Sequence, residues 1–410
     1  MDRHAGGAIP VTSRERILAA INHRAVDRVP IDCGGTRQTG ISVWAYARLR
    51  ERLGLASRSL PRVFDLYQML AEIEQEVADR FGADCVALHR PAVAFGIRNE
   101  DWKSFRFAGG LEAEVPGGFC PERGDRGLVI KRNGSVIAAM PEFSRYFDRF
   151  EKYPGALHPD ISSWRAPRTD GATMEHYHRE AEALFANTDK AVVAAMGPPY
   201  ELFNGMGQGG FEEWMCTFGS EPEYVEELYA ELVDAWLDNL KAFHAAVGDR
   251  VQVLQICDDF GTQHAPFLST RMFRRLVLPA YKRGLDWVHA NTTWKVLLHS
   301  DGAIYPLLPS IIEMGVDILN PVQTSAAGMD PARLKREFGD RLCFWGASCD
   351  AQGTFDTGTP AEVAEETARN LTIFVPGSGL VFAPIHNVQA HVSPDNIIAL
   401  FDTALNYRIR

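Results

Sequence analysis

Three residues in the second half of the chain are of the types that bind metal ions or move protons. His299 and Asp301 end the apolar run Lys295–Leu298, and Cys349 ends a later apolar run. Residues two apart at a strand end point to the same side, so His299 and Asp301 can face a common ligand. With Cys349 they form three donors of a tetrahedral zinc site, which leaves a fourth position open for water or substrate. The ionised carboxylate and thiolate would neutralise the ion and leave a Lewis acid. The plainer alternative is a hydrogen-bonded His299–Asp301 pair beside an inert thiol.

Other polar residues also follow apolar runs. Asp258 and Asp259 come directly after Val251–Cys257 and could form a general acid–base pair, in which one carboxylate raises the pKa of the other. The alternative is a capped strand end with one aspartate bound to backbone amides. His386 could act as a general acid, as a substrate donor or as a structural residue, and Arg37 could hold a carboxylate or phosphate. The residues expected to orient a substrate are Arg37, Gln38, His89, Gln263, Asn320, Gln323 and Asn387.

The apolar runs alternate with helical patterns along the chain. Eight such runs lie near residues 29, 84, 191, 251, 294, 317, 342 and 379, and a helical segment follows each. Residues 63–81, for example, have the apolar spacing of one long amphipathic helix. Eight β/α units predict a closed (β/α)8 barrel, whose active site lies at the carboxyl ends of the strands. A doubly wound open sheet is the alternative, but no Gly-x-Gly-x-x-Gly motif follows a strand.

Residues 95–165 interrupt this alternation. Turn signals at Gly109-Gly110, Pro116–Gly118 and Arg132–Ser135 separate short alternating runs, which predicts a β-hairpin insertion between the second and third strands. Its loops are candidates for a lid or for substrate contacts. No repeat or low-complexity linker separates the insertion, which favours a single domain over residues 1–410.

Size and composition limit the class of protein. The chain has 410 residues, 46% hydrophobic and 23% charged, which is typical of a soluble globular protein. No apolar run approaches the roughly 20 residues of a membrane span, and the N-terminus lacks the apolar core of a secretion signal, so we expect a cytoplasmic protein. The net charge of −11, with acids and bases mixed, disfavours a nucleic-acid partner. Seven scattered cysteines without a CxxC pair favour reduced thiols.

Several segments resemble the uroporphyrinogen decarboxylase superfamily, and the likeness extends over about residues 12–405. They are Thr12–Arg16, Asp27–Pro30, Gly315–Pro321, and Gly339-Asp340 before Trp345-Gly346. The resemblance implies a (β/α)8 barrel and one of two chemistries. One is cofactor-free decarboxylation of the acetate groups of a tetrapyrrole. The other is zinc-dependent methyl transfer that involves a corrinoid protein, a thiol or a folate.

Two places in the sequence separate these chemistries. The decarboxylases carry Arg-Gln-Ala-Gly-Arg near the N-terminus, whereas this chain reads Arg37-Gln38-Thr39-Gly40-Ile41 and lacks the second arginine. Their aspartate after a nearby strand is not evident either, because that strand ends in His89. The methyltransferases carry His-x-Cys and a later Cys as zinc ligands, and the matching residues here are His299, Asp301 and Cys349. Aspartate in place of cysteine keeps the ligand charge and makes the site harder.

The resemblance therefore implies a zinc-dependent, methyltransferase-like enzyme for methyl transfer, demethylation or related C–X cleavage on a small molecule. His299, Asp301 and Cys349 would hold the metal, with Asp258, Asp259 and His386 as catalytic groups. Tetrahydrofolate or a corrinoid would carry the methyl group, and the corrinoid must come from a partner protein because a cobalamin-binding domain does not fit into this length. The resemblance also implies a homodimer. The alternatives are a metal-independent decarboxylase and a non-catalytic barrel that binds a corrinoid or tetrapyrrole.

Overall fold

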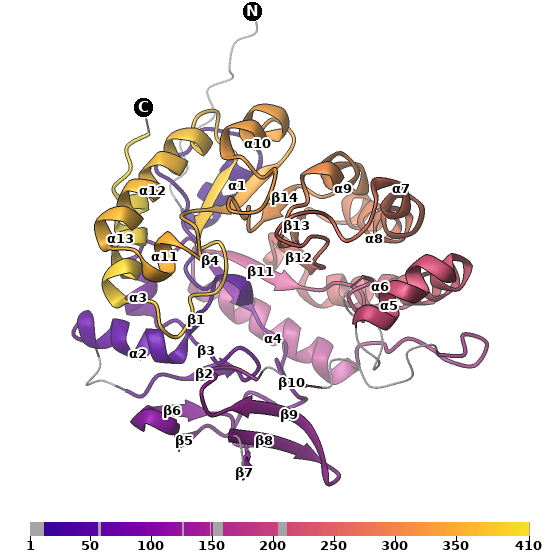
Figure 1. Ribbon diagram of the computed structural model, residues 1–410, viewed down its shortest axis with the longest axis horizontal. Coiled ribbons are helices and arrows are strands. Elements are labelled where there is room, and N and C mark those ends of the chain that lie inside the picture. Colours follow the sequence, from indigo (N-terminus) through magenta and orange to yellow (C-terminus); the bar gives the residue numbers. More distant parts are fainter. Residues whose placement is uncertain are drawn as a thin grey trace, which may run out of the picture.

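A parallel sheet of seven strands forms the centre of the molecule, in the order β16-β15-β14-β13-β12-β11-β4 (Figure 1). The computed structural model describes residues 12–55, 59–124, 127–147, 159–203 and 211–409, and the backbone of residues 149–150. The strands are mostly apolar because the parallel sheet is covered on both faces. They are β4 (Cys85–Leu88), β11 (Ala191–Ala195), β12 (Val253–Cys257), β13 (Lys295–His299), β14 (Ile318–Asn320), β15 (Cys343–Ala347) and β16 (Leu380–Ala383).

The eighth strand position is a single residue, Ile31. It forms parallel bridges with Phe382 on one side and with Ala83 on the other. The N–H of Asp32 donates to the carbonyl of Phe382 over 2.8 Å, and the N–H of Asp84 donates to the carbonyl of Ile31 over 2.7 Å. These bonds join β16 to the start of β4 and curl the sheet into a ring. The predicted (β/α)8 barrel is thereby confirmed, with its strands at the predicted positions.

Helices surround the barrel (Figure 1). Thr359 and Glu362 form a capping box at the start of α12 (Pro360–Phe374), while Asp330 and Ser393 cap α10 (Pro331–Phe338) and α13 (Pro394–Leu405). None of the helices in the described part of the chain is long and apolar enough to cross a membrane. The longer helices are α2 (Val43–Arg52), α4 (Gly171–Asn187), α5 (Phe211–Ser220), α6 (Pro222–Val247), α8 (Leu278–Asn291), α10 (Pro331–Phe338), α12 (Pro360–Phe374) and α13 (Pro394–Leu405). Shorter ones are α3 (Gln75–Arg80), α7 (Thr270–Met272), α9 (Leu308–Met314) and α11 (Thr354–Thr357).

The barrel interior has its own apolar cluster. Along β13, Leu297 belongs to this cluster, whereas Val296 and Leu298 belong to the larger core between the sheet and the helices. Helix α1 (Ser13–Ile21) adds Ile17 and Ile21 to the interior cluster and so closes one end of the barrel. Because inward positions alternate along a strand, the next inward residue after Leu297 is His299, at the carboxyl end of β13. The other interior residues are Ala20, Cys85, Ala191, Val193, Val253, Ile318, Cys343, Trp345, Val381 and Ala383.

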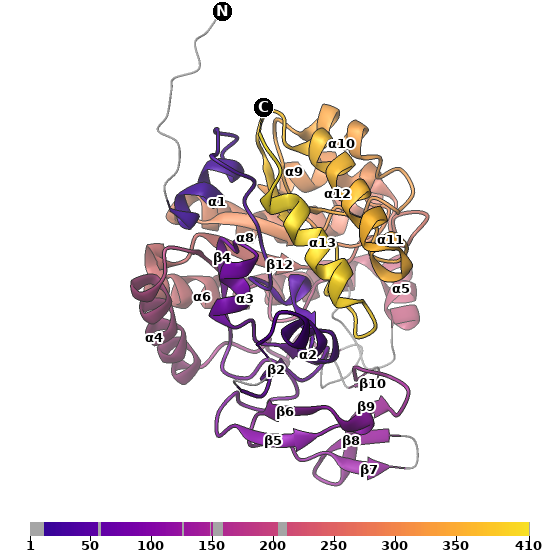
Figure 2. The same ribbon diagram turned by 90° about the vertical axis from the view of Figure 1, so that its left-hand side faces the viewer.

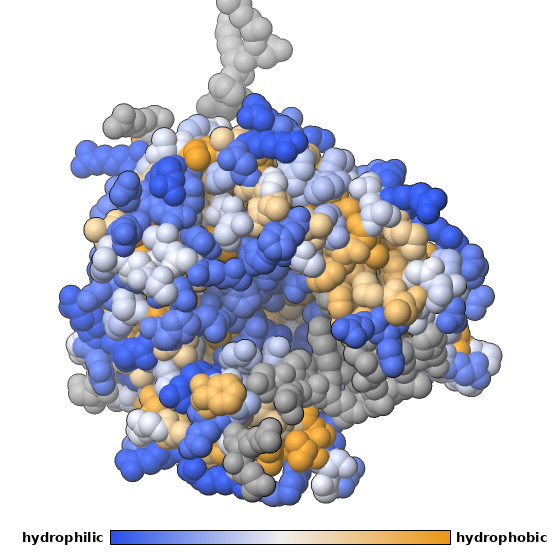
Figure 3. Space-filling model, viewed as in Figure 1, coloured by the Kyte–Doolittle hydropathy of each residue, from blue (hydrophilic) through white to orange (hydrophobic). Residues whose placement is uncertain are grey.

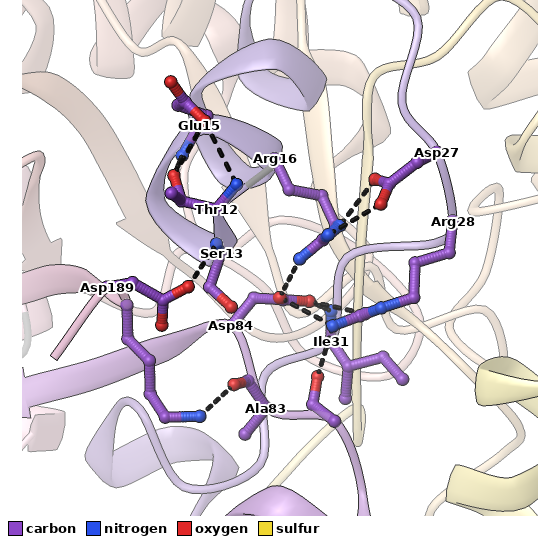
Figure 4. A network of polar contacts seen from close by, with 12 residues as sticks. Thr12, Ser13, Glu15, Arg16, Asp27, Arg28, Ile31, Ala83, Asp84 and Asp189 are labelled. Atoms are coloured by element: carbon purple, nitrogen blue, oxygen red, sulfur yellow. Dashed lines mark hydrogen bonds and ion pairs between the residues drawn. The ribbon is translucent and has the colours of Figure 1, made fainter. Parts of the chain in front are cut away.

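A buried carboxylate fixes α1 to the barrel (Figure 4). Asp84 is fully buried and accepts hydrogen bonds from Arg16 over 2.7 Å and from Arg28 over 2.7 and 2.8 Å. It also accepts from the backbone N–H of Ile31 over 2.9 Å. Arg16 in turn pairs with Asp27 over 2.7 Å. A charge this deeply buried is tolerated because each of its oxygens accepts hydrogen bonds from at least one guanidinium group.

The predicted β-hairpin insertion comes between β4 and β11 in the sequence, and its strands lie together at the lower end of the molecule in Figure 2. The strands β5 (Lys103–Arg106) and β6 (Glu112–Val115) form one antiparallel pair. A four-stranded antiparallel sheet contains β7 (Glu122–Gly124), β8 (Gly127–Arg132), β9 (Ser135–Pro141) and β10 (Arg149–Phe150). Within the predicted segment 95–165, residues 125–126, 148 and 151–158 lie outside the described residues.

The prediction of one helix over residues 63–81 is wrong. The segment contains β2 (Val63–Asp65), β3 (Leu70–Ala71) and only the short α3, and β3 pairs with both β2 and β1 (Ile41–Ser42). The carboxylate of Asp65 accepts from the N–H of Tyr67 over 2.8 Å, which forms a local turn that competes with a helix. Met69 then takes a left-handed backbone conformation, with φ of 54°.

Candidate metal and substrate site at the barrel mouth

The carboxyl ends of β13 and β16 bring three candidate metal ligands together. Oδ2 of Asp301 lies 3.6 Å from Nε2 of His299 and 3.9 Å from Nε2 of His386. The ligand atoms of the three residues all lie within 4.8 Å of one another. Donor atoms around a tetrahedral zinc ion are roughly 3–4 Å apart, so a small closure would let these three share one ion. Two imidazoles and one carboxylate suit zinc and also Fe(II).

Asn320 fixes the tautomer of His299. The side-chain Nδ2 of Asn320 donates to the carbonyl of Trp345 over 2.9 Å, which leaves its Oδ1 2.6 Å from Nδ1 of His299. Since an amide oxygen only accepts, Nδ1 must carry a hydrogen, and in the neutral ring Nε2 then presents its lone pair toward Asp301. Metal-binding histidines usually donate their second N–H to such a partner. Asn320, predicted to bind substrate, therefore orients the candidate ligand His299 through its Nδ1.

The turn that carries Asp301 is held by two other predicted residues. Asp259 accepts from the N–H of Asp301 over 2.9 Å, and Gln323 accepts from the N–H of Gly302 over 2.8 Å. Gly302 has a φ of 90°, and a Cβ there would lie 2.3 Å from the carbonyl oxygen of Gly261. The turn therefore requires glycine, and Asp259 and Gln323 position the metal candidate Asp301.

Cys349 does not join this group. At the end of β15, Gly346 and Ala347 have φ values of 133° and 53°, which interrupt the alternation of inward and outward residues. The thiol of Cys349 is 1% exposed, belongs to the outer apolar core and lies beside Thr367 of α12. Burial raises the pKa of Cys349 to about 12. The structure thus brings His386, rather than Cys349, to the other two candidate ligands.

The predicted acid–base pair is divided between two environments. Asp258 is 1% exposed, and its Oδ2 accepts from the N–H of Phe203 over 2.7 Å and from the hydroxyl of Tyr281 over 2.9 Å. Tyr281 belongs to α8, so this carboxylate ties the strand end to the helical layer. Asp259 instead reaches the backbone of Asp301. The two carboxylates are adjacent in sequence but do not act on a common point, because consecutive residues at a strand end face opposite ways.

A second group of predicted residues follows Ile31 and β4. Nε of Arg37 donates to Asp65 over 2.7 Å, so its charge already has a buried partner. Burial and the neighbouring Arg37 guanidinium lower the pKa of His89 to about 4, which keeps this imidazole neutral. The side chain of Gln38 donates to the sulfur of Cys257 over 3.0 Å. Cys257 is the register partner of His299 on the next strand, so Gln38 extends this polar group toward the metal candidates.

A cavity of about 430 Å³ lies beside the candidate ligands, a size suited to a small molecule. A recess of hydrophilic residues bordered by an apolar area is visible on one face of the molecule (Figure 3). Gln263 lines the cavity and donates to Gln352 over 2.8 Å. Asp350 and Phe355 also line it and were not predicted; their position after a barrel strand is the signal that would have indicated them. The predicted residues in the lining are Asp301, Gln263, Gln323, His386 and Asn387.

Comparisons with known proteins agree with this architecture. A solved structure described as a methyltransferase from Methanosarcina mazei has the same fold, with a TM-score of 0.59 over 96% of this chain and 98% of that chain, at 17% identity. Uroporphyrinogen decarboxylases of Neisseria gonorrhoeae (strain NCCP11945) and Neisseria meningitidis serogroup C (strain 053442) are 24% identical over 221 residues. That match covers 52% of this chain and 58% of the length of those relatives. The family model for uroporphyrinogen decarboxylase (URO-D) matches residues 159–407, more than half of the chain. The chain therefore belongs to the uroporphyrinogen decarboxylase (URO-D) family.

Proposed function

We propose that this protein is a metal-dependent, methyltransferase-like enzyme that acts on a small molecule, with zinc held by His299, Asp301 and His386. The observation that carries the proposal is the convergence of these three ligand atoms within 4.8 Å at the barrel mouth. The residues fit the ion because His299 is held in the tautomer that offers Nε2. The ligand set differs from the predicted one in a single member, His386 in place of Cys349.

The ion, when bound, would supply a Lewis acid that activates a thiol or polarises a leaving group. The chain's own residues would perform the remaining tasks. Asp259 and Gln323 would keep Asp301 in place, and Gln263 and Asn387 would orient the substrate from the cavity wall. Asp350 lines the same cavity and would take the acid–base role predicted for Asp258, which faces the helical layer.

The fold shared with a solved methyltransferase supports methyl transfer as the reaction class. We propose that a corrinoid protein or tetrahydrofolate carries the methyl group. Metal-free decarboxylation is the second candidate function, because the curated relatives are uroporphyrinogen decarboxylases. The pairing of Arg37 with Asp65 and the lowered pKa of His89 argue against it, since neither side chain then offers a free charge to substrate carboxylates.

Metal content per chain tests the proposal. We expect one zinc ion in the wild type and in Cys349→Ser, and loss of the ion in His299→Ala and His386→Ala. His391→Ala is the matched control for His386→Ala, because His391 lies nearby in the same loop, pairs with Asp356 and is 62% exposed. Methyl transfer from methylcobalamin or methyltetrahydrofolate to a thiol, measured on the same proteins, should follow metal content. Loss of zinc in Cys349→Ser together with retention of zinc in His386→Ala would show that Cys349, and not His386, is the third ligand. A metal-free wild type that decarboxylates uroporphyrinogen would establish the second candidate.

A further inference from the structure

A second cavity, of about 210 Å³, lies next to the one at the candidate metal ligands. His386, Asn387 and Gln389 line both cavities. The two cavities therefore meet at these three residues, which places the second cavity beside the metal candidate His386. The hairpin insertion contributes to this cavity, because Arg145 and Tyr146 follow β9 and lie in its lining.

The second cavity is lined by one arginine and by neutral polar groups. Arg145 is its one permanently charged residue, and among the described residues no carboxylate lines it. The lining of the second cavity thus carries a net positive charge, whereas the whole chain has a net charge of −11. A concave site of this composition favours an anionic ligand. The other polar residues of its wall, besides the three shared ones, are Ser42, Tyr67, Gln68 and Tyr146.

The guanidinium of Arg145 has no acidic partner within the part of the chain that the structure describes. Its Cζ lies 5.2 Å from the centre of the Trp44 ring. By contrast, Arg37 pairs with Asp65 over 2.7 Å, and Arg106 on the neighbouring hairpin pairs with Glu112 over 3.1 Å. Stacking on an aromatic ring orients a guanidinium while its N–H groups remain available for a carboxylate or phosphate.

Ser42 gives an independent indication of a ligand. It is 4% exposed and lines the second cavity, and its hydroxyl makes no hydrogen bond to any described residue. Ser42 occupies the N-cap of α2, where a serine usually accepts from the first turn, yet that bond is not formed. Buried hydroxyls rarely lack a partner, and the N-terminal end of a helix favours negative charge. An anion in the cavity would supply the missing acceptor.

We propose that the second cavity binds an anionic group of the substrate, a carboxylate or a phosphate, through Arg145 and Ser42. The reacting atom would then lie at the ion held by His299, Asp301 and His386. This inference rests on the proposed function and adds the substrate class: a small molecule with an anionic group at one end.

Calorimetric titration of the full chain with inorganic phosphate and with succinate tests the proposal, in zinc-loaded and in chelator-treated protein. Arg145→Gln should weaken binding of the preferred anion by about ten-fold or more, because a charge-assisted contact is lost. Ser42→Ala should weaken it by a few-fold and leave the unfolding midpoint unchanged, since the hydroxyl has no protein partner to lose. Arg106→Gln, which removes the same charge from an exposed position of the insertion, should bind like the wild type.

Binding of phosphate or of succinate that weakens in Arg145→Gln supports the anion site. The anion that binds more tightly of the two shows whether the site prefers a phosphate or a carboxylate. No binding of either, or equal binding by wild type and Arg145→Gln, overturns it. Failure of the proposed function is distinguishable: a protein that holds no metal but binds the anion through Arg145 keeps the anion site and loses the metal enzyme. One zinc ion per chain without anion binding that depends on Arg145 would support the metal site and overturn the anion site.

Discussion

The amide oxygen of Asn320 accepts a hydrogen bond from Nδ1 of His299 over 2.6 Å. The two residues are register partners at the ends of β14 and β13, so the bond joins side chains of two neighbouring strands. The orientation of the His299 lone pair is thus set by two barrel strands and the carbonyl of Trp345 on a third. A candidate ligand positioned in this way is held more rigidly than one on a loop.

Replacement of Asn320 by alanine should weaken metal binding by about 10–100-fold, because His299 loses the partner that fixes its tautomer and ring orientation. Competition with a chromophoric chelator measures the affinity. Asn370→Ala is the matched control: Asn370 is also a buried amide that donates to a backbone carbonyl, that of Ser348, but it belongs to α12. Equal loss of affinity in both variants would show that general destabilisation, rather than support of the ligand, explains the effect.

Cys349 should be unreactive in the folded protein. Burial raises its pKa to about 12, so the thiolate that reacts with alkylating agents is scarce at pH 8. The exposed Cys120 and Cys216 should be modified first by iodoacetamide, and Cys349 only after unfolding. Peptide mass mapping gives the order. Removal of metal with a chelator should leave the rate at Cys349 unchanged, and acceleration there would identify it as a released metal ligand.

Asp84→Asn should lower the free energy of unfolding by about 3–5 kcal/mol, because it leaves the charges of Arg16 and Arg28 without their buried partner. Urea titration measures this change. Asp402→Asn removes an ion pair of the same kind between two partly exposed side chains, Arg80 (41% exposed) and Asp402 (34% exposed), and should cost less than about 1 kcal/mol. Similar costs for the two variants would contradict the role of Asp84 in joining α1 to the barrel.

His89 should make the protein less stable at acidic pH. Its pKa in the folded state is about 4, below the value of about 6.5 in an unfolded chain. Between these values the unfolded chain binds a proton that the folded protein does not, so stability falls as pH decreases from about 6.5 to 4. Since the ring is only partly buried, we expect a loss of about 1–2 kcal/mol over this range. The difference between wild type and His89→Gln in urea titrations at several pH values isolates this contribution, and parallel curves would refute it.

The barrel could be predicted because its signals are local. Short apolar runs mark the strands, and capping residues such as Thr359 and Glu362 mark the helix starts without reference to the rest of the chain. Over residues 63–81, where a helix was wrongly expected, a local apolar pattern does not determine the structure. The apolar spacing suits a helix, but the carboxylate of Asp65 forms a turn with its own following backbone.

The candidate site was predicted only in part, because its geometry depends on contacts between distant segments. His299 and Asp301 share one strand end, so their spacing alone placed them together. The direction of Cys349 depends on the backbone at Gly346, where the carbonyl of Pro321 leaves no room for a Cβ. Arg145 reaches the mouth from the insertion, and no spacing in the sequence relates it to His386.

In the described part of the chain, one bridging residue, Ile31, closes the ring of strands, and its N–H donates to the side chain of Asp84 rather than to a backbone carbonyl. The closure of the barrel is therefore its mechanically weakest point, because one residue there replaces a whole strand. Fluctuations that open the barrel should begin at this closure. The amide protons of Asp32 and Asp84 should then exchange with solvent before those of β12 and β13. Arg37 and Gln38 follow this closure directly, and Gln38 reaches across to Cys257. A ligand that contacts both sides of the barrel mouth would therefore also stabilise the closed barrel and slow its opening at Ile31.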